Sequence, residues 1–169
     1  MLIILAGLPG SGKTTIAREL SRALGAVHVR IDSIEQAIRD AGIMVGDLRD
    51  SGYRAGYAIA EDNLRLGRTV VADSVNPLLV SRDAWIEVAQ RAQVEAIEVE
   101  IECSDREEHR RRVEERLSDL PGLLLPTWEQ VVSRAYDPWT RKRMVVDTAS
   151  KDVAQSIQAI LELLPRPRT

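Results

Sequence analysis

The sequence predicts an α/β protein with a parallel sheet of about five strands and helices on both faces of that sheet. Short apolar runs alternate along the chain with longer segments that have helical spacing. The first run, at residues 2–6, is apolar throughout, as in strands that are buried on both faces. The chain has 169 residues, about the length of one domain. We expect one domain over residues 1–164 and a disordered tail at 165–169.

In the first half of the chain, glycines follow the predicted helices. Residues 13–24 place apolar side chains at helical spacing, and Gly25 follows as a stop signal. Residues 51–66 are predicted to be helical despite Gly52 and Gly56. In order, the elements are a strand at 2–6, a helix at 13–24, a strand at 27–31, helices at 33–41 and 51–66, and a strand at 70–72.

The second half continues the same alternation. Residues 94–103 alternate between apolar residues and glutamates, which predicts a strand with one wetter face. Sequences of capping-box form begin at Ser104 and Thr127 and predict helix starts just after them. In order, the elements are a helix at 81–92, a strand at 94–103, helices that begin near 105 and 128, a strand at 145–146 and a helix at 152–164.

The composition argues against several classes of protein. The formal net charge is -3, so the chain has no overall cationic field that would attract nucleic acid. No apolar run approaches the roughly 18 residues needed to cross a bilayer, so we expect no membrane partner and a cytoplasmic location. The single cysteine, Cys103, and two separated histidines, His28 and His109, offer no cluster for a protein-built zinc site.

The strongest chemical signal is the segment Gly7-Leu8-Pro9-Gly10-Ser11-Gly12-Lys13-Thr14, which matches the pattern G-x-x-x-x-G-K-[ST]. Glycines let successive backbone N–H groups turn toward one anion, and the helix that follows adds the positive end of its dipole. Lys13 is expected to contact the β- and γ-phosphates of a nucleotide, and the Thr14 hydroxyl to bind Mg²⁺. The predicted nucleotide-binding residues are Gly7, Leu8, Pro9, Gly10, Ser11, Gly12, Lys13, Thr14 and Thr15.

Three further segments accompany this phosphate-binding loop. They are Ile31-Asp32 after the second strand, the run from Val70 to Asn76, and an arginine-rich helix from Glu107 to Arg116. Together with the loop, they resemble the small P-loop kinases related to chloramphenicol phosphotransferase, gluconate kinase and the kinase domain of polynucleotide kinase. The resemblance implies a three-layer P-loop nucleoside-triphosphate hydrolase fold, a short helical lid at about 110–127, and ATP and Mg²⁺ as cofactors.

Two aspartates follow predicted strands, at the edge where open α/β sheets bind ligands. The resemblance implies that Asp32 accepts the proton of the acceptor hydroxyl, and that Asp73 holds Mg²⁺ directly or through water. The two roles could be exchanged, because both carboxylates would face the same phosphates. As structural alternatives, Asp32 would cap a helix that begins at Ser33, and Asp73 would be a simple turn residue.

The resemblance also implies that lid arginines close over the phosphates. Arg112 and Arg116 are the catalytic candidates, since residues four apart share a helix face. Arg110 and Arg111 lie in the same cluster, and the intervening glutamates leave a solvated, ion-paired helix face as the alternative. Without a ligand, we expect residues 117–126 to be mobile.

A substrate pocket is predicted from Tyr53, Arg54 and Tyr57. Two tyrosines one helical turn apart combine apolar area with hydroxyl groups, as a small-molecule site requires. Core packing is the alternative for this pair. By resemblance, the turn at residues 147–149 is expected beside the adenine.

These features predict an ATP- and Mg²⁺-dependent phosphotransferase that moves the γ-phosphoryl group to a hydroxyl of a small-molecule acceptor. The expected partners are a nucleoside triphosphate and a small hydroxyl-bearing substrate, bound by a monomer or a homodimer. Two alternatives stay open: a nucleotide-gated regulatory ATPase or switch, and a polynucleotide 5′-hydroxyl kinase. The sequence does not select one acceptor among gluconate, antibiotics, nucleosides and similar alcohols.

Overall fold

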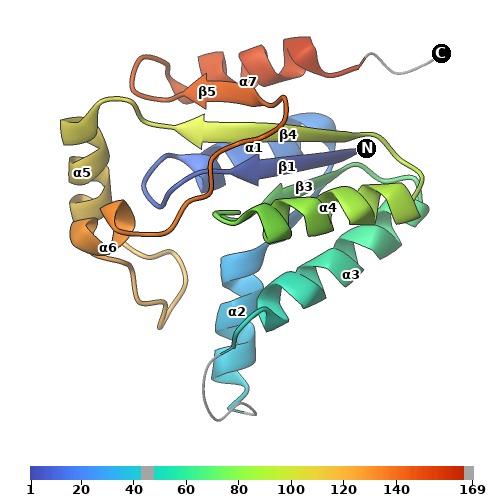
Figure 1. The fold of residues 1–169 in the computed structure, drawn as a ribbon, viewed down its shortest axis with the longest axis horizontal. Helices are drawn as coiled ribbons and strands as arrows, with labels where there is room; N and C mark the ends of the chain where they lie inside the picture. The colour runs from blue at the N-terminus through green and yellow to red at the C-terminus, as the bar shows by residue number, and fades with distance from the viewer. Residues whose placement is uncertain (43–47, 166–169) are drawn as a thin grey trace.

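The computed structural model describes residues 1–42 and 48–165, and a five-stranded parallel sheet lies at its centre (Figure 1). The strand order is β2-β3-β1-β4-β5. The strands are β1 (Leu2–Ala6), β2 (Val27–Arg30), β3 (Val70–Asp73), β4 (Ala96–Glu102) and β5 (Met144–Asp147). The predicted α/β fold class and its parallel sheet are therefore confirmed, whereas residues 166–169 of the predicted tail lie outside the described residues.

Helices connect the strands and form the outer layers. In chain order they are α1 (Lys13–Leu24), α2 (Ile31–Asp40), α3 (Ser51–Arg65), α4 (Leu79–Arg91), α5 (Arg106–Glu115), α6 (Trp128–Val132) and α7 (Val153–Leu163). Helices α1 and α7 cover one face of the sheet, and α3 and α4 cover the other (Figure 1). Helices α5 and α6 lie beside the carboxyl ends of the strands, where the arrowheads of Figure 1 point.

None of the helices formed by the described residues has the length and apolar character that crossing a bilayer requires.

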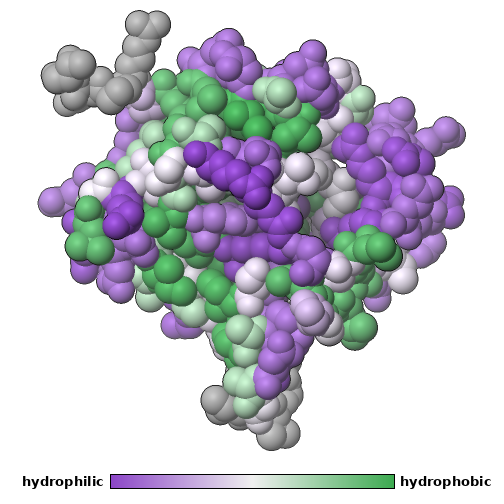
Figure 2. All heavy atoms as spheres, turned by 180° about the vertical axis from the view of Figure 1, so that it is seen from behind, coloured by the Kyte–Doolittle hydropathy of each residue, from purple (hydrophilic) through white to green (hydrophobic). Residues whose placement is uncertain are grey.

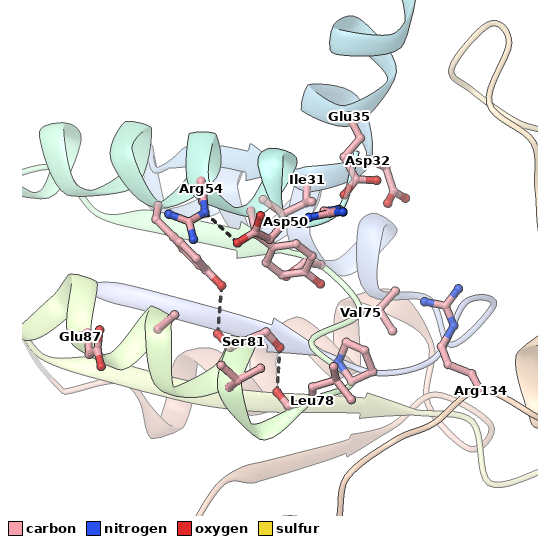
Figure 3. A pocket seen from close by; sticks show the side chains of 17 residues that line it. Ile31, Asp32, Glu35, Asp50, Arg54, Val75, Leu78, Ser81, Glu87 and Arg134 are labelled. Carbon is pink, nitrogen blue, oxygen red and sulfur yellow. Dashed lines mark hydrogen bonds and ion pairs between the residues drawn. The ribbon is translucent and has the colours of Figure 1, made fainter. Parts of the chain in front are cut away.

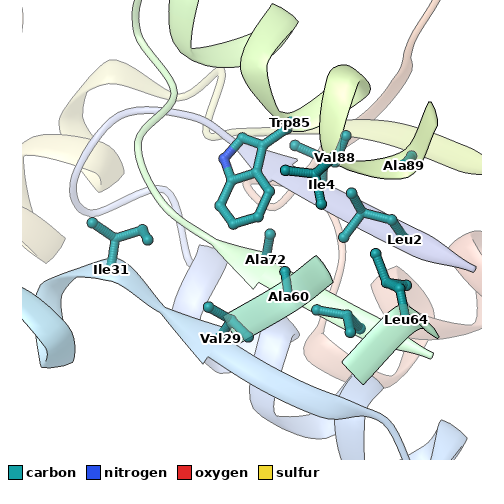
Figure 4. Close-up of a cluster of buried hydrophobic side chains, with 11 residues drawn as sticks. Leu2, Ile4, Val29, Ile31, Ala60, Leu64, Ala72, Trp85, Val88 and Ala89 are labelled. Carbon is teal, nitrogen blue, oxygen red and sulfur yellow. The ribbon is translucent and has the colours of Figure 1, made fainter. Parts of the chain in front are cut away.

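The central strand β1 explains why the first apolar run has no polar position. Leu2 and Ile4 point into the core beneath α3 and α4, while Ile3 and Leu5 point into the core beneath α1 and α7. Figure 4 shows Ile4 close to Trp85 of α4 in the first of these cores. Both faces of β1 are buried, so the apolar residues are needed at every position.

The expectation of a wetter face on β4 was wrong for Glu98 and Glu100, whereas Glu102 at the end of the strand is exposed. Glu98 and Glu100 are buried, because the segment before β5 brings arginines across that face. Arg141 Nη2 donates to Glu98 Oε1 at 2.7 Å, and Arg143 pairs with Glu100. Alternation along the strand does not reveal this pairing, since the partners of Glu98 and Glu100 are 43 residues away.

Three helix boundaries also differ from the sequence expectation. Helix α2 begins at Ile31, so Asp32 lies inside its first turn and does not cap it. The cap of α5 is Asp105, since the Ser104 hydroxyl donates instead to Asp147 at 2.6 Å. Helix α5 ends at Glu115, and Arg116 is already extended. The capping box predicted at Thr127 is confirmed.

Candidate active site

The loop between β1 and α1 is shaped to surround an anion. Gly10 has a φ of 84°, and a Cβ added there would lie 2.5 Å from Val113 Cγ2, so neither the conformation nor the space accepts a larger residue. No side chain caps the start of α1 at Gly12. The Ser11 hydroxyl is buried and has no hydrogen-bond partner among the described residues. These free donors fit the phosphates of a nucleotide.

Lys13 holds its charge at the floor of this site. Its side chain is 7% exposed, and Nζ donates to the carbonyl oxygen of Leu8 at 3.0 Å. Burial lowers the pKa of Lys13 to about 8, although the carboxylates of Asp73 and Asp32 act in the opposite direction. A phosphate group would supply the missing negative charge beside this ammonium group.

The lowered pKa predicts a pH dependence of nucleotide binding. Above about pH 8 the free protein loses the Lys13 proton, so binding an anionic phosphate must recover that proton. We expect ADP affinity, measured by calorimetry in EDTA, to fall roughly tenfold between pH 7 and pH 9. The residual affinity of a Lys13→Met variant should stay flat over this range, and a flat profile in the unmodified protein would contradict the assignment.

A first cavity of about 270 Å³, here called the P-loop cavity, opens above Lys13. Its lining includes Lys13, Thr14, Arg30, Asp32, Glu35, Asp73, Ser74, Val75, Arg116 and Arg134. Asp73 is 3% exposed and accepts a hydrogen bond from His28 Nε2 at 3.1 Å. Asp32 has 49% of its side chain exposed. The structure therefore brings both predicted aspartates to one cavity in two different environments.

The oxygen donors of Thr14 and Asp73 line the P-loop cavity together and fit Mg²⁺, which prefers one or two carboxylates plus substrate phosphates. Within residues 1–42 and 48–165 no group of three His, Cys, Asp or Glu side chains is arranged to hold a metal ion. Phosphate oxygens would therefore complete the coordination.

Helices α5 and α6 pack directly on the phosphate-binding loop. His109 Nε2 donates to the carbonyl oxygen of Pro9 at 2.9 Å, and its ring lies edge-on to Trp128 at 5.2 Å. Val113, Val131 and Trp128 form a small buried cluster against Leu8. Sequence reasoning did not assign His109 to this contact, because only the fold brings residues 9 and 109 together.

The carboxylate of Asp119 joins the segment after α5 to β2 and α1. Asp119 accepts from Arg30 Nη1 and Nη2 at 2.8 and 3.0 Å, and it also pairs with Arg18. Hydrogen bonding from Arg30 holds the pKa of Asp119 well below its usual range. The segment at 117–126 lines the P-loop cavity, and its mobility without a ligand stays a prediction. Neither Arg30 nor Asp119 carried a signal in the sequence.

The two candidate lid arginines occupy different places, contrary to the shared helix face that we expected. Arg116 leaves α5 as the chain extends toward Asp119, and it lines the P-loop cavity. Its Nε is buried without a partner among the described residues. Arg112 stays on the helix and donates to Thr148 Oγ1 at 2.8 Å and to Glu108 Oε1 at 2.8 Å.

The alternative of a solvated, ion-paired helix face is confirmed for the outer face of α5. Arg110 pairs with Glu114, and Arg111 pairs with Glu108 and Glu115. In Figure 2, which turns the molecule around, the region of α5 lies at the right and is dominated by hydrophilic residues. Arg110 and Arg111 therefore belong to a solvated, ion-paired surface.

A groove of about 390 Å³ runs beside the loop on the α1 side. It is lined by Gly10, Gly12, Lys13, Thr14, Thr15, Arg112, Glu115 and Arg116. A neighbouring hollow joins Gly12 and Thr15 to Arg112 and Thr148. Thr148, in the turn at residues 147–149 that we expected beside the adenine, thus lies next to the phosphate-binding loop. Arg112 lines both hollows, whereas Arg116 lines the groove with Lys13.

A second and larger cavity of about 580 Å³, here called the tyrosine cavity, lies between α2, α3 and α4 (Figure 3). It contains all three predicted substrate residues. Its lining is Ile31, Asp32, Glu35, Arg49, Asp50, Tyr53, Arg54, Tyr57, Ser74, Val75, Pro77, Leu78, Val80, Ser81, Ala84, Glu87 and Arg134. The structure therefore places Tyr53, Arg54 and Tyr57 together, although Arg54 is largely exposed and pairs with Asp50 at 2.7 Å.

Both tyrosines also pack in the core, so the two interpretations of this pair are compatible. Tyr53 and Tyr57 contact the core cluster, and the Tyr57 ring meets Trp85 edge-on at 4.6 Å. Their remaining ring surface lines the cavity.

Five residues line both cavities: Asp32, Glu35, Ser74, Val75 and Arg134. Glu35 lies three residues after Asp32 on α2, and burial raises its pKa, opposed by Arg39. A Cβ added at Gly52 would lie 2.2 Å from Glu35 Cγ, so a larger residue there would have to displace the Glu35 side chain. Sequence reasoning missed Glu35 and Arg134. The i, i+3 spacing from Asp32 was the one available signal for Glu35.

Comparisons with known proteins show which family the chain belongs to. The sequence pattern of the AAA domain family matches residues 2–122. Shikimate kinase of Corynebacterium glutamicum is 32% identical over 148 residues, which are 78% of this chain and 83% of that enzyme. A Mycobacterium tuberculosis protein is 31% identical over 83 residues, which are 46% of this chain. The chain spans 17% of the length of that mycobacterial protein.

Three solved structures share the fold. The Mycobacterium tuberculosis APS kinase CysC in complex with AMPPNP and APS has a TM-score of 0.72 at 18% identity, with 96% of this chain and 95% of that chain covered. Chaetomium thermophilum Kti12 in complex with ADP-AlF3 has a TM-score of 0.70 at 23% identity, with 98% and 100% covered. A gluconokinase from Sinorhizobium meliloti has a TM-score of 0.62 at 20% identity, with 95% and 89% covered.

At these identities, the structural likeness supports the three-layer fold alone. The family assignment rests on the pattern matched over residues 2–122 and on the shikimate kinase relative. Both agree with the phosphate-binding loop at the end of β1. The chain belongs to the AAA domain family and, within it, to the small P-loop kinases.

Proposed function

We propose that this chain transfers the γ-phosphoryl group of ATP, with Mg²⁺, to a hydroxyl of a small molecule bound in the tyrosine cavity. One observation carries the proposal: Asp32 lines both the P-loop cavity and the tyrosine cavity. A carboxylate at that junction reaches a phosphate on one side and an acceptor on the other. A protein that only hydrolyses a nucleotide has no need of the second cavity.

The nucleotide side of the proposal uses the residues of the loop. Backbone N–H groups of residues 7–15 and the Lys13 ammonium would bind the phosphates, and the groove beside Arg112 and Thr148 would receive the nucleoside. Thr14 and Asp73 would hold Mg²⁺, which neutralises charge on the phosphates when it is bound.

On the acceptor side, the proposal makes Asp32 the general base. The acceptor hydroxyl forms a new bond to the γ-phosphorus, the bond from that phosphorus to the bridging oxygen breaks, and ADP leaves with the electron pair. Asp32 orients the hydroxyl and takes its proton. Asp73 is less suited to this role because it is almost fully buried and bonded to His28. These environments support the assignment of Asp32 as base and Asp73 as metal ligand.

The test is ADP release measured against a library of hydroxyl compounds. We expect one class of small acceptor to stimulate ADP release strongly and to appear as its phosphate ester by mass spectrometry. Two further samples test the alternative functions: a single-stranded DNA with a 5′-hydroxyl and a protein extract. Stimulation by the DNA alone would favour a polynucleotide kinase, and stimulation by a protein without a phosphorylated small molecule would favour a regulatory ATPase.

The lid geometry predicts different effects for the two arginines. Arg116 lines the P-loop cavity together with Asp32 and Lys13, so its charge would contribute most during transfer. We expect Arg116→Ala to lower kcat by about 10² while ADP affinity changes less than about threefold. Arg112→Ala should mainly weaken nucleotide binding. Arg110→Ala, which removes only an exposed ion pair, is the matched control. Equal rates for Arg116→Ala and Arg110→Ala would contradict the role of Arg116.

A further inference from the structure

The outer rim of the tyrosine cavity is unusually apolar for an exposed surface. Leu78 and Val80, where α4 begins, are 41% and 71% exposed and both line the cavity. Pro77 and Ala84 continue the same wall inward. Exposed large apolar side chains that share one cavity wall indicate a surface that a ligand covers.

The opposite wall offers ring surface and few free hydroxyl groups. Tyr53 Oη accepts a hydrogen bond from the backbone N–H of Asn76 at 3.2 Å, and Tyr57 Oη donates to the carbonyl oxygen of Ser81 at 3.3 Å. Figure 3 shows the dashed contact to Ser81 at this wall. Because both hydroxyl groups already have partners in the protein, the rings are left to contact an apolar group.

The charged residues around the tyrosine rings are paired within the protein. Arg54 pairs with Asp50 at 2.7 Å, and Arg49 also has an interaction of its own. Glu87 lies 3.8 Å from Arg91. In Figure 3, Arg134 lies across the cavity from Arg54. Of the arginines that line the tyrosine cavity, Arg134 also lines the P-loop cavity.

An acidic acceptor would need a guanidinium group that faces its carboxylate or sulfate, because such groups bind best through bidentate charged hydrogen bonds. Among the described residues that line the tyrosine cavity, Arg134 is the cation that also lines the P-loop cavity, where phosphate charge would gather, and Asp32 and Glu35 line both cavities with it. The electrostatics of the cavity thus disfavour a second acidic group on the acceptor.

We infer that the acceptor has an apolar, aromatic or alicyclic body without an acidic group, and that it presents its hydroxyl to Asp32 at the inner end of the cavity. The inference rests on the proposed function and names the substrate class of that same site. A cavity of about 580 Å³ lies within the usual range for small-molecule sites and has room for a ring with a hydroxylated side chain.

The first experiment compares defined probes on the full chain. The apolar probes are 3-phenylpropane-1,2-diol and 3-cyclohexylpropane-1,2-diol, and the polar probes are glycerol, gluconate and shikimate. We expect saturation-transfer NMR without nucleotide to detect the apolar diols at concentrations where the polar probes give no signal. With MgATP, the KM of the phenyl diol should be about tenfold or more below that of glycerol, because a ring is removed from water.

The second experiment localises the binding with matched variants. Val80→Gln changes an exposed apolar residue that lines the tyrosine cavity, whereas Leu66→Gln changes one that is equally exposed, at 76%, and lies at the end of α3 outside the cavity. We expect Val80→Gln to raise the KM of the phenyl diol about fivefold with kcat little changed, and Leu66→Gln to leave both unchanged. Equal effects of the two variants would overturn the placement of the apolar body.

The outcomes separate this inference from the proposed function. If gluconate or shikimate is phosphorylated and the apolar diols neither bind nor react, the kinase function stands and the inferred acceptor class is overturned. If the apolar diols bind and Val80→Gln weakens that binding, but no hydroxyl compound stimulates ADP release, the ligand class stands and phosphoryl transfer is overturned. Absence of binding by every apolar probe would overturn the inference outright.

Discussion

Replacement of Lys13 by alanine is expected to lower kcat/KM for phosphoryl transfer by more than about 10³. The ammonium group is buried beneath the phosphate site, where water cannot replace its charge. The same group contacts the loop through Leu8, so its loss removes both a charge and a fixed donor. Coupled ADP release measured over a series of ATP concentrations, with each probe acceptor at saturation, gives kcat/KM for ATP in both proteins.

Folding of the Lys13→Ala variant is a separate question that the structure also addresses. Burial of the lysine lowers its pKa, which means that the charged form is disfavoured in the folded protein without nucleotide. We therefore expect the Tm of the variant to be equal to or above that of the unmodified chain. Lys142→Ala, at an exposed lysine outside the cavities, is the matched control for charge. Near-normal turnover in folded Lys13→Ala would contradict the assignment of the loop.

The sequence predicted those parts of the molecule that depend on local patterns. Strand β1 could be predicted because burial on both faces requires apolar residues at consecutive positions. The phosphate-binding loop could be predicted because its backbone requires glycine at positions such as Gly10. The sequence also indicated that Tyr53 and Tyr57 lie together, since their spacing places them on one helix face, and both line the tyrosine cavity. Their dual role in core and cavity could not be seen from spacing alone.

The missed features depend on contacts between distant residues. Arg30 and Asp119 are 89 positions apart, and nothing near Asp119 in the sequence shows that it would accept hydrogen bonds from Arg30. Arg116 was assigned to a helix face, yet the chain leaves the helix there on its way to that anchor. Glu35 looked like an ordinary exposed residue of an amphipathic helix, and only the approach of α3 at Gly52 buries it beside the cavity.

Replacement of Asp32 by asparagine separates its two possible roles. If Asp32 orients the acceptor hydroxyl and takes its proton, Asp32→Asn should lower kcat by about 10³ while ADP affinity stays within a few fold, since the loss falls on the acceptor alone. The exposed side chain, which lines both cavities, should tolerate the change without loss of folding. Asp62→Asn, on the exposed surface of α3, is a control for the same change in charge.

The magnesium dependence of this variant decides between the two aspartates. With Asp73 as the metal ligand, the Mg²⁺ concentration needed for half-maximal nucleotide binding should be unchanged in Asp32→Asn and raised in Asp73→Asn, since Mg²⁺ is held by few protein carboxylates. His28 should matter for the second variant only, because its hydrogen bond goes to Asp73. If Asp32→Asn instead raises the Mg²⁺ requirement and weakens MgATP binding, then Asp32 holds the metal, and the base must be Asp73.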